Sequence, residues 1–169
     1  EENGRKVCVC PDRDNDGWDA VRALKRMVEM EGDPYTVEQV TKVIVAQRLV
    51  RRLCPKCSQP VALDPLVTEK ARKLAEAGGL AWDSLEKKFR RPKGCKECGN
   101  TGFREREMIS EVLEVTPVIG SALVRGAPEE EIRQLAVGQG MVALAADGIR
   151  RAARGVLSLE EVLWVSGQG

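Results

Sequence analysis

Histidine is absent from the 169 residues of the sequence. Imidazole is the commonest general base near neutral pH, so its absence excludes nucleophilic catalysis built on a Ser-His or Cys-His pair. Aromatic side chains account for 4% of the chain, which disfavours a base-stacking surface for single-stranded nucleic acid. No apolar run is long enough to span a membrane, and the first residues, EENGRKV, do not form a signal peptide.

The sequence also lacks an excess of charge of either sign. Its 27 Lys and Arg residues balance 26 Asp and Glu residues, for a net charge of +1, so no overall field draws the protein to nucleic acid or to an anionic membrane. The length of 169 residues fits one domain, or one with a small appendage. Hydrophobic residues make up 43% of the chain, enough for a packed core. Because the first residue is Glu, we expect a processed chain or a piece of a longer one.

Hydrophobic periodicity predicts an α+β fold that is predominantly α-helical. Alternating Val and Cys predict a short strand over residues 6–10, and apolar residues at helical spacing predict a helix over 18–30. Residues 105–115 are expected to be extended. Further helices are expected at 68–77, after Thr116-Pro117, at 128–137, at 141–154 and after a capping box that begins at Ser158.

A longer helix is predicted over residues 37–53, opened by a capping box of Thr36 and Gln39. Its two sides follow from helical spacing. The apolar side would comprise Val40, Val43, Ile44, Gln47, Val50 and Leu53, and the polar side Lys42, Arg48, Arg51 and Arg52.

Four cysteines form two C-x-x-C pairs, Cys54 with Cys57 and Cys95 with Cys98, separated by 37 residues. Two intervening residues let both thiolates reach one centre at corners of a tetrahedron, about 3.8 Å apart, and four sulfurs leave no position open for water. The pattern therefore predicts a structural zinc ion. Two redox or disulfide pairs are the alternative, which the lack of secretion features disfavours.

The other two cysteines, Cys8 and Cys10, alternate with valines and are interpreted as small buried residues. The run DRDNDG at residues 12–17 has the first half of a calcium loop, D-x-D-x-D-G. The bidentate acid that such a loop requires would fall on Ala23, so we predict a polar turn instead.

Five cations crowd the run KKFRRPKG at residues 87–94, beside the second cysteine pair. They could mark a nucleic-acid interface or a solvated loop. We favour an exposed basic loop, because the rest of the chain offers no basic face and few stacking aromatics.

The run VAQRLVRRLCPKC at residues 45–57 closely resembles the segment that leads into the tetracysteine motif of the type II secretion and type IV pilus assembly ATPases. GCKECGNTGFR at 94–104, EVL at 111–113 and GVLSLEEV at 155–162 resemble later family motifs in the same order. The resemblance covers nearly the whole chain.

The resemblance implies three regions. Residues 1–53 would be the C-terminal part of a RecA-like motor domain, 54–104 a tetracysteine zinc-binding lobe, and 105–169 a C-terminal helical domain. It also implies that Cys54, Cys57, Cys95 and Cys98 hold structural Zn²⁺.

Several family elements are missing or altered. The phosphate loop G-x-x-x-x-G-K-[ST] is absent, Arg13 stands where the family has histidine, and the G-R-x-G motif is changed at 104–108. We expect either the C-terminal piece of a divergent member or a pseudo-ATPase. In either case we expect the chain to have no catalytic residue of its own, and the sequence identifies no nucleotide-binding residue. ATP and Mg²⁺ would be bound only through an upstream motor domain.

The family further implies a cytoplasmic hexamer, peripheral to the inner membrane, that acts on an inner-membrane platform protein. Membrane contact would be indirect, and no nucleic-acid partner is expected. The alternative is a free-standing zinc-containing module that binds protein or nucleic acid. A phosphate loop encoded upstream would favour the motor.

Overall fold

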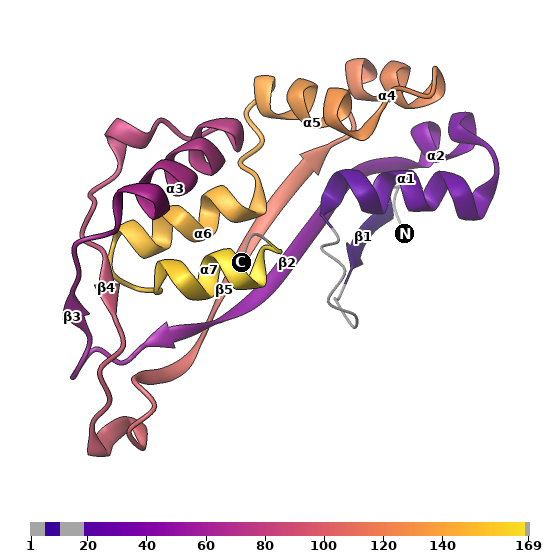
Figure 1. Cartoon of the computed structure of the whole chain (residues 1–169). Coiled ribbons are helices and arrows are strands. Elements are labelled where there is room, and N and C mark those ends of the chain that lie inside the picture. The colour runs from indigo at the N-terminus through magenta and orange to yellow at the C-terminus, as the bar shows by residue number, and fades with distance from the viewer. Residues whose placement is uncertain (1–5, 11–18, 168–169) are drawn as a thin grey trace.

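A long antiparallel pair of strands, β2 (Thr41–Leu53) and β5 (Phe103–Glu114), runs through the molecule (Figure 1). The computed structural model describes residues 6–10 and 19–167. Strand β1 (Lys6–Cys10) pairs with β2 in parallel, which gives the sheet order β1-β2-β5.

Helices pack along this ribbon, and two 3₁₀ turns and a small second sheet complete the described part of the chain. The helices are α1 (Ala20–Glu31), α2 (Pro34–Val40), α3 (Pro65–Ala77), α4 (Pro117–Val124), α5 (Glu129–Gly138), α6 (Leu144–Ala153) and α7 (Leu159–Val165). The remaining elements are β3 (Gln59–Pro60), β4 (Arg90–Arg91) and the turns Trp82–Ser84 and Lys96–Cys98. The predicted α+β, predominantly helical fold is confirmed.

Two hydrophobic clusters lie at successive positions along β2 and β5. The first joins α1, α2, α4 and α5 around Leu24, Ile44 and Leu113. The second joins α3, α6 and α7 around Val50 and Ile109. Both strands contribute to both clusters, so the ribbon holds the two groups of helices in one body.

Most predicted elements are present, because their local signals agree with their packing. Strand 6–10 and the extended segment after the second cysteine pair are confirmed as β1 and β5. The Thr116 hydroxyl accepts from the amide of Ile119 at the start of α4, and Ser158 accepts from the amide of Glu161 at the start of α7. Three glutamates occupy the first turn of α5, where they complement the helix dipole.

The predicted helix over 37–53 is wrong: helix α2 ends at Val40 and residues 41–53 form strand β2. Val43, Ile44 and Val45 are β-branched, and such a run suits a pleated strand as well as a helix face. Pairing with β1 on one side and β5 on the other selects the strand. The buried positions then alternate, with Ile44, Ala46, Arg48 and Val50 facing inward.

Two details of that prediction change with it. Asp33, not Thr36, caps α2, because its carboxylate accepts the amides of Tyr35 and Thr36 at 3.1 and 3.0 Å. Arg48 is buried instead of facing a polar surface, and its guanidinium donates to the carbonyl of Val165 at the C-terminus of α7. A cation at that end complements the helix dipole.

The predicted exposed loop over 87–94 is only partly correct. Arg90 and Arg91 form β4, and the Phe89 ring is buried and stacks on Trp82 with ring centroids 6.0 Å apart. The Lys88 amide donates to the carbonyl of Ala153 at 2.7 Å. This segment is therefore anchored to α6, and its lysines remain at the surface.

Candidate metal centre

The two cysteine pairs lie at the adjoining ends of β2 and β5. Cys54 follows the last residue of β2, and the second pair precedes β5. Leu53 pairs with Phe103 across the ribbon, and the Cys54 amide donates to the carbonyl of Gly102 at 2.9 Å. The strand register therefore brings together cysteines that are about 40 residues apart in the sequence.

The four sulfur atoms form a compact group. The Sγ atoms of Cys54 and Cys95 are 4.0 Å apart, those of Cys57 and Cys98 are 3.9 Å apart, and those of Cys95 and Cys98 are 3.7 Å apart. All four lie within 4.8 Å of one another, and none is in a disulfide. Metal–sulfur bonds of about 2.3 Å in a tetrahedron would separate the sulfurs by about 3.8 Å. The group thus fits one metal ion.

Backbone amides point at two of the sulfurs. The amides of Cys95 and Gly102 donate to the Cys98 sulfur at 3.3 and 3.2 Å. Burial alone would raise the pKa of the Cys98 thiol, but these amides and the neighbouring thiols lower the pKa to about 6. For Cys57, burial and the three neighbouring thiols outweigh the amide of Gly94 and raise the pKa to about 11. The Cys98 thiol is therefore more acidic than a free cysteine, and the neighbouring Cys57 thiol is less acidic.

Two glycines give the second knuckle its shape. Gly94 has φ +101° and Gly102 has φ +79°, in the left-handed region that disfavours side chains. An added Cβ would approach the carbonyl oxygen of Asn100 to 2.7 Å at Gly94, and Cβ of Pro92 to 2.5 Å at Gly102. Glycine at these positions lets the chain close around the sulfurs.

The insert between the pairs braces the first knuckle. The Arg90 guanidinium donates to the Ser58 hydroxyl at 2.9 Å and also to the Ser58 carbonyl. At the base of the lobe, the Arg51 guanidinium lies 4.3 Å from the centre of the Phe103 ring and pairs with Glu161 of α7. The metal centre is thus tied to the C-terminal helix.

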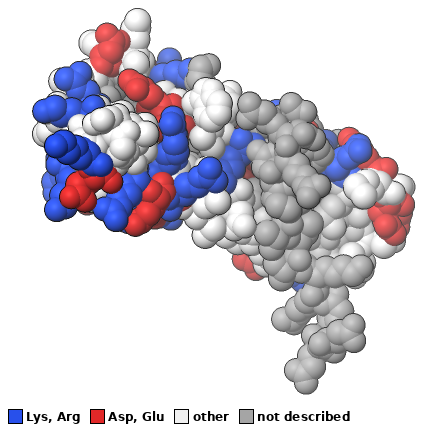
Figure 2. All heavy atoms as spheres, turned by 90° about the horizontal axis from the view of Figure 1, so that it is seen from below, with Lys and Arg blue, Asp and Glu red and all other residues white. Residues whose placement is uncertain are grey.

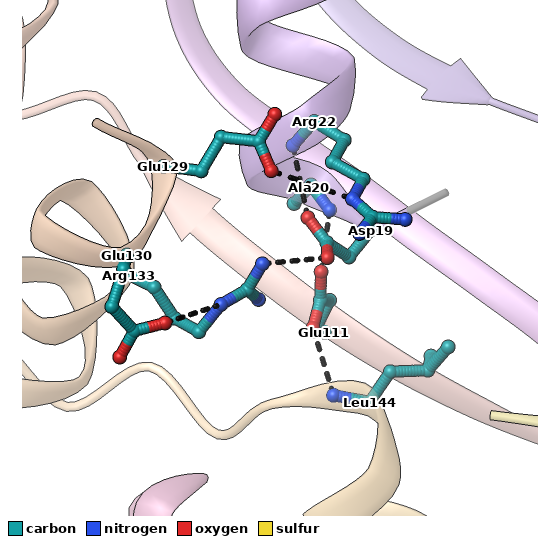
Figure 3. Close-up of polar contacts among 8 residues, drawn as sticks. All are labelled: Asp19, Ala20, Arg22, Glu111, Glu129, Glu130, Arg133 and Leu144. Atoms are coloured by element: carbon teal, nitrogen blue, oxygen red, sulfur yellow. Dashed lines mark hydrogen bonds and ion pairs between the residues drawn. The ribbon is translucent and has the colours of Figure 1, made fainter. Parts of the chain in front are cut away.

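A second polar cluster lies where the two groups of helices meet (Figure 3). The Glu111 carboxylate, on β5, is 2% exposed and accepts the amide of Leu144 at 2.8 Å and that of Ala20. Burial raises the pKa of Glu111, although these two amides oppose the shift. Beside it, Arg133 pairs with Asp19 at 2.7 Å.

These residues border a cavity of about 460 Å³ between α1, α3, α5 and α6. Arg22 and Glu129 are 3.4 Å apart across its mouth. The cations and carboxylates are paired with one another, so the cluster serves to join α1, α5 and α6. Sequence reasoning did not assign Glu111 this role. An acid at an inward position between Ile109 and Leu113 is the signal that could have found it.

Some expectations fall outside the described residues. The calcium-like run at 12–17 and Arg13 lie there, and the side chains of Cys8 and Cys10 are also not described. No helix in the described ranges is both long and apolar enough to cross a membrane.

Comparison with known proteins places the chain in a family. The family described as "Type II/IV secretion system protein" matches residues 17–164. The "Type IV pilus assembly ATPase PilB" of Thermus thermophilus is 36% identical over 86% of the chain and 16% of its own length. The "Type II secretion system protein E" of Klebsiella pneumoniae is 35% identical over 88% of the chain and 28% of its own length. PilB of Myxococcus xanthus is 34% identical over 86% of the chain and 25% of its own length.

The chain therefore belongs to the type II/IV secretion system protein family. It spans less than a third of the length of each of these relatives.

Proposed function

We propose that the chain is the C-terminal portion of a hexameric motor ATPase that drives pilus or pseudopilus assembly and protein export. The family match over residues 17–164 carries this proposal. The relatives are named for type IV pilus assembly and type II secretion, and the extra length of those relatives leaves room for a nucleotide-binding domain. The division at residues 53/54 and 104/105 is part of the same proposal.

The four-cysteine group is assigned to structural Zn²⁺. A tetrahedral set of four thiolates suits zinc or iron, and the sulfur spacing of 3.7–4.0 Å accommodates either. Zinc is preferred because a closed four-sulfur site for a redox-inactive ion needs no electron-transfer partner. The bound ion would cross-link the adjoining ends of β2 and β5. Metal analysis of protein purified without chelator, together with its visible spectrum, separates colourless zinc from coloured iron.

The chain by itself is proposed to lack ATPase activity. Phosphoryl transfer requires a phosphate cradle, a lysine and Mg²⁺, and the sequence contains no phosphate loop. Nucleotide chemistry would belong to a preceding motor domain, in a cytoplasmic assembly at the inner membrane that acts on a platform protein. Phosphate release by the purified chain with Mg²⁺ and ATP should equal the protein-free rate. Turnover abolished by a point substitution within these 169 residues would contradict this.

The motor role is tested in the organism that encodes the chain. Replacing Cys54 and Cys95 by serine in the genome should abolish surface pili or export of secreted proteins, while the protein level is followed by immunoblot. Normal pili and normal export with a metal-free protein would show that the ion is not required, and normal pili and export after deletion of the whole gene would overturn the motor role. The free-standing binding module would instead leave both processes intact when the whole gene is deleted.

A further inference from the structure

The two ends of the molecule differ in charge. We call residues 51–60 and 86–106, which surround the four cysteines and leave out α3, the metal lobe. They contain 11 Lys and Arg but only three Asp and Glu, a surplus of eight positive charges. The whole chain has a net charge of only +1, so the rest carries a net charge of −7. Figure 2 shows many of these cations gathered at the left end of the molecule, which is the end of β3 and β4 in Figure 1.

A groove of about 570 Å³ lies beside this lobe, between α3, α7 and the start of β5. Its apolar lining comprises Val67, Pro92, Phe103, Leu163 and Trp164. Trp164 is 64% exposed, and aromatic side chains of this kind are common anchors of protein interfaces. The volume of the groove is in the range of pockets that enclose side chains or ligands.

Charge around the groove favours an acidic occupant. Among the residues that line it, Arg51 and Lys70 are balanced in number by Glu160 and Glu161. Arg91 and Lys93, on either side of Pro92, are exposed. Neither lines the groove, and neither forms an ion pair within the described part of the chain, so they leave unpaired positive charge next to Pro92, which does line it.

The turn between α1 and α2, residues 29–35, has the complementary composition. We call it the elbow. Met30 is 77% exposed and Tyr35 is 63% exposed, and Gly32, with φ +77°, turns the chain sharply between them. The surrounding residues 26–41 include four Asp and Glu and one Arg. That residue, Arg26, pairs with Glu29 at 2.8 Å, so the acidic surplus around the elbow is three. In Figure 1 the elbow lies at the end of the molecule opposite the metal lobe.

We propose that the elbow of one copy of the chain docks in the groove of a second copy. Met30 and Tyr35 would enter the apolar groove beside Trp164, and the carboxylates around them would meet the cations that flank Pro92. This removes exposed apolar surface at both ends and pairs opposite charges. The inference rests on the self-association proposed above and names the contact that produces it.

The contact is heterologous, because elbow and groove lie at opposite ends of the same molecule. Each copy in a chain of contacts would use both surfaces, so the assembly grows head to tail and either closes into a ring or forms a filament. A variant with a defective elbow should therefore still pair with a variant that has a defective groove, because each supplies the surface that the other lacks. A dimer formed through one two-fold symmetric surface would not show this pairing.

The test uses sedimentation velocity of the metal-loaded chain across a concentration series. The native chain should associate, and association should weaken as salt is raised because the contact includes charge pairs. Met30→Glu and Trp164→Glu should each raise the dissociation constant about tenfold or more, which is typical of interface hot spots. Both side chains are exposed, so circular dichroism should show unchanged folding.

Mixing the two variants decides the geometry. The Trp164→Glu chain keeps its elbow and the Met30→Glu chain keeps its groove, so the mixture should form a one-to-one dimer and grow no further. Leu49→Glu, an exposed position on the open face of β2, serves as the matched control and should leave association unchanged.

Three results would overturn the proposal: a native chain that is monomeric at every concentration, a mixture of variants that does not pair, or association abolished by Leu49→Glu alone. The readout depends on neither pili nor export. Failure of this contact is therefore distinguishable from failure of the proposed motor role.

Discussion

Glu111 and Leu144 join the two groups of helices through one hydrogen bond: the carboxylate on β5 accepts the first amide of α6 at 2.8 Å. The same carboxylate accepts the amide of Ala20, the first residue of α1. No residue next to α6 in the sequence caps that helix with its side chain, so a distant strand supplies the acceptor. One buried acid thus accepts the first amide of each of two helices.

Glu111→Ala should therefore be strongly destabilising. It removes an acceptor from two helix N-termini and leaves buried amides without a partner, which should lower the free energy of unfolding by about 2–4 kcal/mol. Glu114→Ala on the same strand, at an exposed position, is the matched control and should change stability by less than about 0.5 kcal/mol. Denaturant unfolding followed by circular dichroism measures both; equal effects would contradict the double-capping role.

The stability contributed by Glu111 should depend on pH. Burial raises its pKa above the usual 4.5, so the folded state binds this proton more tightly than the unfolded state does. The contribution is then fully present below the unfolded pKa and declines as pH rises through the folded pKa. Relative to Glu111→Gln, which does not titrate, the native chain should lose stability over the pH range above the usual glutamate pKa of 4.5.

Unfolding free energies of both proteins across that interval test the sign. A native chain that gains stability over the variant as pH rises would show that the two amides outweigh burial and lower the pKa.

The rate of alkylation should differ between two neighbouring cysteines of the metal site, Cys98 and Cys57. In metal-free protein at pH 7, Cys98 with its pKa of about 6 is largely thiolate, while Cys57 with its pKa of about 11 is thiol. Iodoacetamide should therefore label Cys98 well before Cys57, since the thiolate is the nucleophile. Bound metal should protect both, and peptide mass spectrometry follows the order. Equal rates in the metal-free protein would contradict these pKa values.

Strand β2 makes a simple prediction about neighbouring residues. Val50 is fully buried, whereas Leu49 is 60% exposed on the opposite face. Val50→Ala should cost about 2–3 kcal/mol of unfolding free energy because it removes buried methyl groups and leaves a cavity. Leu49→Ala should cost less than about 0.5 kcal/mol. Thermal or denaturant unfolding compares the two; a larger loss for Leu49→Ala would contradict the strand orientation.

Local sequence signals determined much of this protein. The C-x-x-C spacing identified the four residues whose sulfurs the fold brings together, because two intervening residues by themselves shape a metal-binding knuckle. Thr116 and Ser158 marked the starts of α4 and α7, since a capping hydroxyl acts within three residues. These features depend on contacts between near neighbours in the chain.

Tertiary structure decided what such signals leave open. Residues 41–53 carry apolar positions that suit a helix face or a strand, and pairing with β1 and β5 selected the strand. That choice turned Arg48 inward to the end of α7 and set the register that brings Cys54 to Cys95. The double cap by Glu111 likewise depends on residues 91 and 33 positions away. Such partners are fixed only when the strands and helices assemble.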